Sequence, residues 1–119
     1  MDKKELYKYI SDQYGDEPDY PWDGYPMNAV FRHRSNRKWY ALVMDVPRQR
    51  LGQSGEGVVT VMNVKCGPIL MGSYLGCPGI LPAYHMNKTN WVSVLLDGSA
   101  RDGDVIDLLN ISYDMTKGQ

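Results

Sequence analysis

The residues most able to do chemistry on a charged partner lie in a basic stretch around a predicted β-hairpin. Residues 32–50 carry six cations against the single acid Asp45: Arg32, Arg34, Arg37, Lys38, Arg48 and Arg50. The turn Ser35-Asn36-Arg37 separates two β-rich runs, so cationic side chains on either side of it can surround one protruding hairpin tip. Such a tip can neutralise DNA phosphates and release counterions, and His33, Trp39 and Tyr40 could stack on unpaired bases. The alternative is that these cations only keep an edge strand soluble and unpaired.

A second group of side chains suited to binding lies in the segment from Ala83 to Trp91. Five polar-tipped or aromatic residues fall within eight positions there: Tyr84, His85, Asn87, Lys88 and Trp91. Together they could line a pocket for an anionic or planar ligand. The alternative is structural. His85 and Asn87 would satisfy backbone groups in an irregular turn, and Trp91 would belong to the core.

Neither catalysis nor metal binding finds support in the spacing of reactive residues. Cys66 and His85 could form a thiolate and its base, but no oxyanion-hole glycine signature and no orienting acid accompanies them. Cys66 is therefore interpreted as a small buried hydrophobic residue. The two His and two Cys lack the short paired spacing of zinc sites. For the acidic stretch 12–23 we favour a solvated loop over a weak cation site, and we expect no enzyme, no cofactor and no metal.

The composition indicates one folded domain without a strong overall charge. Hydrophobic residues make up 43% of the 119 residues, which argues against disorder, and this length suits one core. The net charge of −1 argues against a general nucleic-acid binder, so a DNA contact would depend on the local basic stretch. No apolar run is long enough to span a bilayer, no secretory signal is evident, and two cysteines are too few for a disulfide scaffold. We therefore expect a cytoplasmic protein with no membrane partner.

The first half of the chain predicts a helix followed by a hairpin. Asp2 and Glu5 form a capping pair for a helix over residues 3–14. Apolar residues then recur at helical spacing within that range. The β-rich runs 29–34 and 38–44 form the hairpin that presents the basic stretch.

The second half predicts two further strands, over residues 57–64 and 91–96, and two further helices. The first of these helices begins at Gly67-Pro68, where Pro is tolerated, and turns three side chains inward: Ile69, Leu70 and Tyr74. The segment 77–82 is interpreted as turns. Adjacent strands with short connections favour a single α+β domain over residues 1–119, with two layers and an antiparallel sheet that carries its helices on one face.

Several motifs, taken in order, carry a resemblance to a known family. They are Tyr20-Pro21-Trp22, Lys38-Trp39-Tyr40-Ala41, Asn63-Val-Lys-Cys-Gly-Pro68, His85-Met-Asn-Lys88 with Trp91, Leu96-Asp97-Gly98 and Ile111-Ser112-Tyr113. Over almost the whole chain this series resembles the MmcQ/YjbR family. The resemblance implies a frataxin-like (CyaY-like) α+β fold and DNA binding through two hairpin-like projections, described as a double wing. Thr89 and Asn90 stand where such proteins often carry basic or His residues, which removes charge from one projected contact surface.

DNA is therefore the first expected partner, bound through the hairpin at 32–38 and the segment 84–91. The predicted contact set is Arg32, Arg34, Arg37, Lys38, Arg48, Arg50 and Lys88. The alternative is a small-molecule or protein-binding module that uses the Tyr, His, Asn and Trp side chains of the segment 84–91 and has no nucleic-acid role. The salt dependence of binding distinguishes these two functions. The affinity of a phosphate contact falls steeply as the salt concentration rises, whereas the affinity of an aromatic pocket does not.

Overall fold

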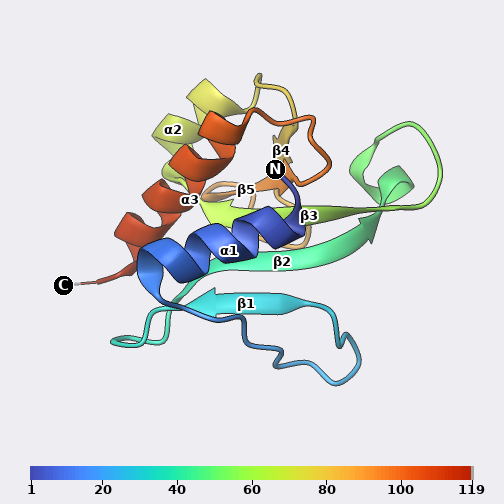
Figure 1. Cartoon of the computed structure of the whole chain (residues 1–119). Coiled ribbons are helices and arrows are strands. Elements are labelled where there is room, and N and C mark those ends of the chain that lie inside the picture. Colours follow the sequence, from blue (N-terminus) through green and yellow to red (C-terminus); the bar gives the residue numbers. More distant parts are fainter. Residues whose placement is uncertain (119) are drawn as a thin grey trace.

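An antiparallel sheet of five strands, in the order β1-β2-β3-β5-β4, forms the centre of the molecule (Figure 1). The computed structural model describes residues 1–118. In chain order the strands are β1 (Ala29–Arg32), β2 (Trp39–Pro47), β3 (Val58–Lys65), β4 (Ile80–Pro82) and β5 (Trp91–Leu95). The helices are α1 (Lys3–Tyr14), α2 (Gly67–Tyr74) and α3 (Asp102–Thr116), with a short 3₁₀ turn after β2, η1 (Arg48–Leu51). The predicted α+β class and antiparallel sheet are confirmed.

Helix α1 begins and ends where its local signals predict. The Asp2 carboxylate accepts from the backbone N–H of Glu5 at 2.9 Å, and the Glu5 carboxylate accepts from the backbone N–H of Asp2 at 3.2 Å. Gly15 ends the helix with a φ of 70°, a left-handed conformation that glycine adopts without steric cost. Leu6 and Ile10 lie one turn apart and are fully buried, which ties the helix to the core.

The sheet has a helix face and a loop face, and both are apolar. Successive side chains of a strand point to opposite faces. In β2, Ala41 and Val43 join the core beneath the helices, whereas Leu42, Met44 and Val46 join a second cluster on the other side. The first cluster contains buried residues from α1, α2 and α3. All three helices therefore cover the same face of the sheet, as expected.

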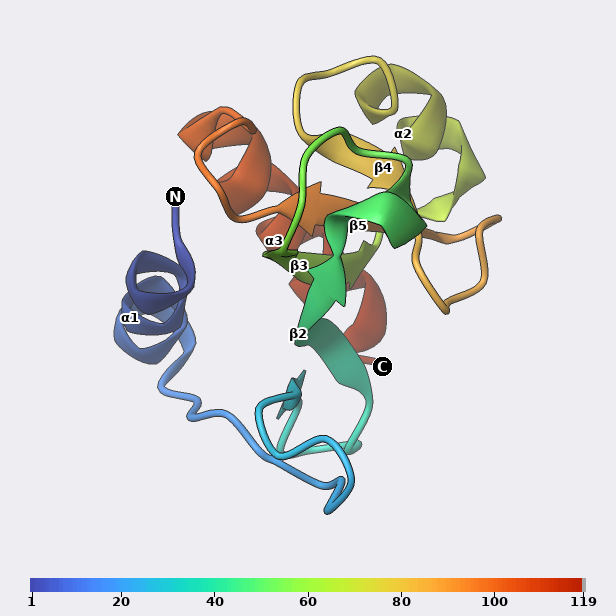
Figure 2. The same cartoon turned by 90° about the vertical axis from the view of Figure 1, so that its right-hand side faces the viewer.

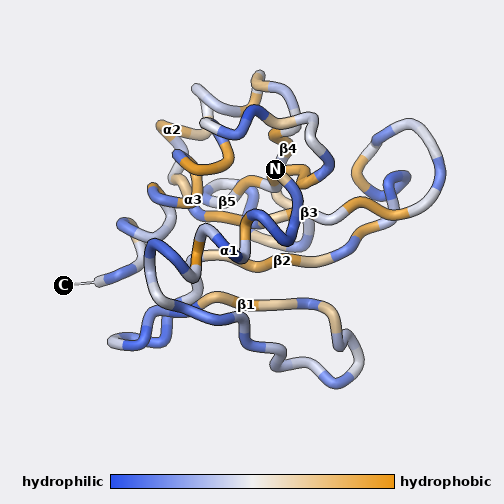
Figure 3. The backbone as a smooth tube through the Cα atoms, viewed as in Figure 1, coloured by the Kyte–Doolittle hydropathy of each residue, from blue (hydrophilic) through white to orange (hydrophobic). Residues whose placement is uncertain are grey.

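Loops cover the second face of the sheet, which we call the loop face. Partly buried side chains from separate segments pack on it: Trp22, Leu51, Tyr84 and Met86. Figure 2 shows α1 on one side of the strands and the loop after β4 on the other. Strands β2, β3 and β5 are hydrophobic along most of their lengths (Figure 3), which is typical of strands buried on both faces.

Helix α2 turns a different side inward from the one predicted. Ile69 is 89% exposed and Leu70 is 39% exposed, whereas Met71 is buried, so the expectation for Ile69 and Leu70 was wrong. The helix has only eight residues and carries apolar side chains all around it. Periodicity over so short a window does not select one face. None of the helices in the described part of the chain has the length and apolar character that crossing a bilayer requires.

The segment 77–82 contains a strand that the sequence did not predict. Strand β4 pairs with β5 at the edge of the sheet, with Ile80 opposite Val94. Pro82 and the preceding Pro-Gly favour turns, which is why the strand was missed. An edge strand tolerates Pro because one side of it needs no ladder hydrogen bond.

Candidate functional site

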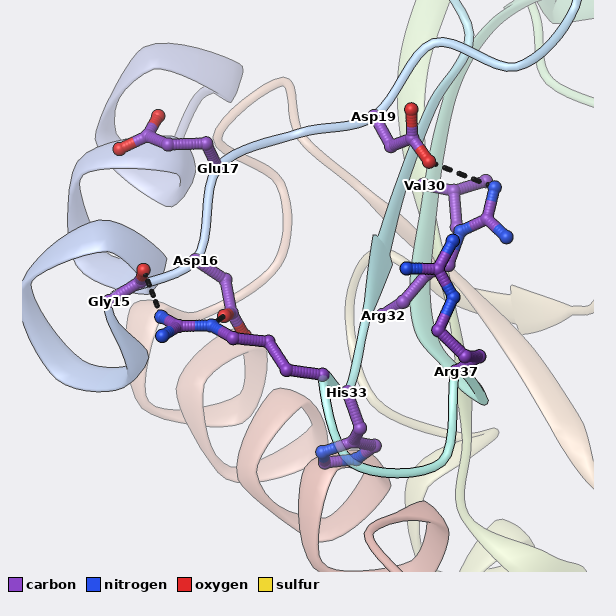
Figure 4. A pocket seen from close by; sticks show the side chains of 9 residues that line it. Gly15, Asp16, Glu17, Asp19, Val30, Arg32, His33 and Arg37 are labelled. Atoms are coloured by element: carbon purple, nitrogen blue, oxygen red, sulfur yellow. Dashed lines mark hydrogen bonds and ion pairs between the residues drawn. The ribbon is translucent and has the colours of Figure 1, made fainter.

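The basic hairpin does not stand free, because the acidic segment after α1 lies against it (Figure 4). Arg32 Nη2 is 2.9 Å from Asp19 Oδ2. Arg34 Nε is 3.1 Å from Asp16 Oδ1, and Arg34 Nη2 donates to the carbonyl of Gly15 at 2.6 Å. The acidic stretch that we interpreted as a solvated loop thus neutralises two arginines of the predicted DNA-contacting set.

His33 and Tyr40 belong to the core, so the expectation that they stack on bases was wrong. Tyr40 is fully buried and donates its hydroxyl to Asp16 Oδ2 at 2.7 Å. Burial, together with the negative charge of Asp16, raises the pKa of Tyr40 above its ordinary value. His33 is 4% exposed, and its Nε2 lies 2.9 Å from Thr116 Oγ1 on α3. These contacts connect the base of the hairpin to the segment after α1 and to α3.

The other predicted cations comprise one paired residue and four exposed ones. Arg48 Nη1 is 3.3 Å from Asp97 Oδ2. Burial alone would raise the pKa of Asp97, but hydrogen bonds from Ser99 and Arg48 hold it below its usual value. Within residues 1–118 the exposed cations have no carboxylate partner: Arg37, Lys38, Arg50 and Lys88. Arg37 lies in the hairpin turn and Lys38 follows it, whereas Arg50 and Lys88 lie on the loop face.

A pocket of about 430 Å³ opens on the loop face, between the loop before β1 and the loop after β4. We call it the aromatic pocket, and its lining comprises Trp22, Tyr25, Asn28, Leu42, Met44, Asp45, Pro47, Arg50, Tyr84 and His85. Trp22 packs edge-on against Trp39, with ring centroids 5.6 Å apart, so one wall is braced by the sheet. Tyr25 is 67% exposed, which leaves its ring available to a ligand.

Tyr84 and His85 form the opposite wall in an uncommon backbone conformation. His85 has a φ of 57°, in the left-handed region that residues other than glycine rarely occupy. The two rings contact each other, with centroids 3.9 Å apart. Arg50 Nη1 lies 3.4 Å from Tyr84 Oη, which brings a cation from η1 to the same wall. Such strain persists only where surrounding contacts stabilise it, and it clusters at binding sites.

Two buried polar residues of the sheet supply those contacts. Asn63 Nδ2 donates to the Tyr84 carbonyl, and the Tyr84 N–H donates to Ser93 Oγ, each at 2.9 Å. The Ser93 hydroxyl donates to Asn63 Oδ1, and both side chains are fully buried. We did not predict either residue as part of the site. The available signal was a polar residue within a short apolar run of each strand, Asn63 in Val-Met-Asn-Val and Ser93 in Val-Ser-Val.

The remaining residues of the segment 84–91 have different surroundings. Asn87 Oδ1 accepts from the backbone N–H of Thr89 at 2.8 Å, which stabilises a local turn. Trp91 is half-buried and starts β5 opposite Lys65. Lys88 lines a smaller hollow of about 210 Å³ that shares Arg50 and Tyr84 with the aromatic pocket. The structure therefore brings Tyr84, His85, Arg50 and Lys88 together and leaves Asn87 and Trp91 outside the lining.

Cys66 has the properties of a core residue. It is 2% exposed, and burial raises the pKa of its thiol, so the unreactive protonated form prevails at neutral pH. Cys66 and Cys77 are both unpaired. Across residues 1–118, no three His, Cys, Asp or Glu side chains gather in a way that could hold a metal ion.

Several known proteins are similar to this chain, and their names state no function. A family model described as YjbR matches residues 11–115. The uncharacterised protein YyaQ of Bacillus subtilis is 38% identical over 117 residues, which cover 98% of this chain and 99% of that protein. The crystal structure of a Pseudomonas syringae protein is 42% identical, with a TM-score of 0.94 over 98% of this chain and 99% of that one. Deinococcus radiodurans DR2400, a DUF419 domain, shares the fold at 23% identity, with a TM-score of 0.68 over 99% of this chain and 80% of that one.

Proposed function

This chain belongs to the YjbR family, and we propose that it is a non-enzymatic binding protein whose site is the aromatic pocket. The proposal rests on one observation. Arg50 lies far in sequence from Tyr84 and His85, yet all three line one pocket whose base is formed by apolar side chains. A concave, mostly apolar surface with a few fixed polar groups is the usual form of a small-molecule site. The left-handed backbone at His85 adds local strain of the kind found at such sites.

The lining defines the class of ligand that we propose, a planar organic anion. Leu42 and Met44 offer an apolar floor, and the Tyr25 and Tyr84 rings offer flat faces at the sides. Arg50 presents a planar guanidinium to a carboxylate or phosphate group. Lys88 in the adjoining hollow adds a second positive charge. The one acid of the lining is Asp45, and its Oδ1 already accepts a hydrogen bond from Thr60 on the neighbouring strand.

Ligand titrations followed by NMR test this function. Aromatic carboxylates and nucleoside monophosphates should shift the resonances of Tyr25, Tyr84 and His85 in a saturable way. Arg50→Gln should weaken binding roughly ten-fold or more, since a hydrogen bond to a charged group is lost. Arg101→Gln is the matched control, because Arg101 is an exposed arginine that pairs with Asp104 outside the pocket. Uniformly small shifts across both ligand classes would refute the proposal.

DNA binding is the second candidate, and one observation favours it. Arg37 and Lys38 are exposed beside the hairpin tip without a carboxylate partner in the described part of the chain, so they can meet backbone phosphates. Duplex binding at low salt should fall steeply as salt rises and should weaken in Arg37→Ala/Lys38→Ala. Equal affinity of the double variant and the unaltered protein would exclude the hairpin as a DNA contact.

Three further properties complete the proposal. The helix face that carries α1, α2 and α3 supports a frataxin-like (CyaY-like) relationship, which structural superposition on that fold would test. Buried, protonated Cys66 supports binding over catalysis. Two unpaired cysteines support a reducing, cytoplasmic location, which cell fractionation would test.

A further inference from the structure

A second cavity, of about 220 Å³, lies between the acidic segment 15–19 and the basic hairpin. We call it the arginine cavity, because Arg32, Arg34 and Arg37 all line it (Figure 4). It shares no lining residue with the aromatic pocket. Its lining is also mostly charged, with three arginines and three acids, whereas apolar and aromatic side chains form most of the aromatic pocket.

Three acids and three arginines line the arginine cavity, but only two of the arginines form ion pairs with those acids. Arg32 pairs with Asp19, and Arg34 pairs with Asp16. The third acid of the lining, Glu17, instead accepts from Ser11, and Figure 4 shows its carboxylate directed away from the arginine side chains that it labels. Arg37 therefore has no carboxylate partner within residues 1–118.

Arg32 also has an unused donor. Its Nε–H is buried and has no hydrogen-bond partner in the described part of the chain, although Nη2 reaches Asp19. A buried donor without a partner is unfavourable, and native structures seldom leave one. Two neighbouring guanidinium groups thus hold hydrogen-bonding capacity that the protein itself does not use.

The backbone holds Arg37 in place by specific contacts. Arg37 has a φ of 65°, and its N–H donates to the His33 carbonyl at 2.9 Å. Asn36 closes the same turn, since its Oδ1 accepts from the Lys38 N–H and its Nδ2 donates to the Thr116 carbonyl, each at 2.9 Å. The turn is therefore tied to α3, and the Arg37 side chain is presented to the cavity from a defined position.

We propose that the arginine cavity is a site for a phosphate group, bound by Arg37 and Arg32, with Asp19 as an internal competitor for Arg32. A guanidinium fork matches phosphate oxygens in two parallel hydrogen bonds. The Asp19 side chain is 53% exposed, so it can turn into water when a stronger anion arrives. Its backbone remains in place, because Asp19 and Val30 exchange two hydrogen bonds of 2.8 and 2.9 Å.

The test is a titration with inorganic phosphate at constant ionic strength, with phosphate replacing chloride. The arginine Nε–Hε and backbone resonances of residues 32–37 should shift and saturate. Arg37→Asn should weaken binding about ten-fold or more, and Asn is chosen because it tolerates the left-handed conformation. Asp19→Asn should strengthen binding several-fold, because the competing charge is gone while the backbone contact stays.

Arg101→Gln is the matched control, since Arg101 is an exposed arginine that pairs with Asp104 and lies outside the lining, and it should leave phosphate binding unchanged. A parallel titration with a short DNA duplex distinguishes the source of the phosphate group. If binding of inorganic phosphate depends on Arg37, the natural ligand carries a small phosphate group. If only binding of the duplex depends on Arg37, the ligand is a nucleic-acid phosphate. Absence of an Arg37-dependent shift in both arms, or weaker binding by Asp19→Asn, overturns the site. Neither result affects the aromatic pocket, whose residues are separate.

Discussion

Replacement of Asn63 by Ala should destabilise the protein and loosen one wall of the aromatic pocket. The Asn63 side chain is fully buried, donates to the Tyr84 carbonyl and accepts from the Ser93 hydroxyl. The substitution leaves both partners without these hydrogen bonds, the Ser93 hydroxyl in a buried position and the Tyr84 carbonyl in a partly buried one. Each unsatisfied buried group costs about 1–3 kcal/mol, so the two together should lower the free energy of unfolding by about 2–6 kcal/mol. A loss of that size is a large part of a typical domain's stability.

Urea denaturation, followed by tryptophan fluorescence, measures this loss. The slope of the free energy with urea should stay constant, which shows that the native fold is retained. NMR of the native variant should show shifted resonances for Tyr84 and His85, because the network that positions them is broken. Ligands of the aromatic pocket should bind Asn63→Ala more weakly than the unaltered protein.

Two companion variants sharpen the experiment. Asn87→Ala removes an exposed turn hydrogen bond in the same loop and should cost less than about 1 kcal/mol. In Asn63→Asp the buried carboxyl should have a raised pKa, because burial disfavours its charged form. Its stability should therefore fall as pH rises above about 4, the pKa of an unfolded aspartate. Equal losses for Asn63→Ala and Asn87→Ala, or an unchanged pocket in Asn63→Ala, would refute the anchoring role.

Further outcomes follow from the glycines and from titrating groups. Gly79→Ala should cost about 2–5 kcal/mol, because a Cβ at a φ of 73° is strained and would lie 2.6 Å from the backbone nitrogen of Ala100. Gly98→Ala, with a φ of 90° and open space, should lose only the part due to strain, and equal losses in denaturation would contradict this. Burial lowers the pKa of His33, so below a pH of about 6.5 the unfolded chain binds a proton there that the folded chain does not. The free energy of unfolding should therefore fall as pH drops below about 6.5, and His33→Gln should remove this pH dependence. The pKa of Asp97 is lowered from 3.8, so its contribution should be lost as pH falls below that value, and Asp97→Asn should abolish this acid dependence.

The elements with strong local signals were predictable from sequence. The capping box of Asp2 and Glu5 acts within one helical turn, so its sequence pattern is sufficient to locate the start of α1. The short helix α2 and the edge strand β4 were harder, for opposite reasons. The residues of α2 are apolar on several sides, so only contact with the sheet decides that Met71 faces inward. Strand β4 contains turn residues and is a strand because β5 pairs with it.

The candidate sites were also only partly predictable from the sequence. The sequence contained the cations at 32–50, the acids at 12–23 and the segment 84–91 as separate patterns. It did not reveal that the acids neutralise part of the hairpin, because ion pairs between Asp19 and Arg32 depend on where the loop after α1 crosses the sheet. Nor did it reveal that Arg50 meets Tyr84, since η1 and the loop after β4 approach each other only through the folded sheet.

By itself, the sequence determined the α+β class, the boundaries of α1, the basic turn and the family resemblance. Each of these depends on periodicity, capping or motifs that act over a few neighbouring residues. Only the tertiary structure decided which charges are matched and which side chains share a cavity. Those properties depend on distances between residues far apart in the chain, and the packing of two apolar faces of one sheet fixes those distances.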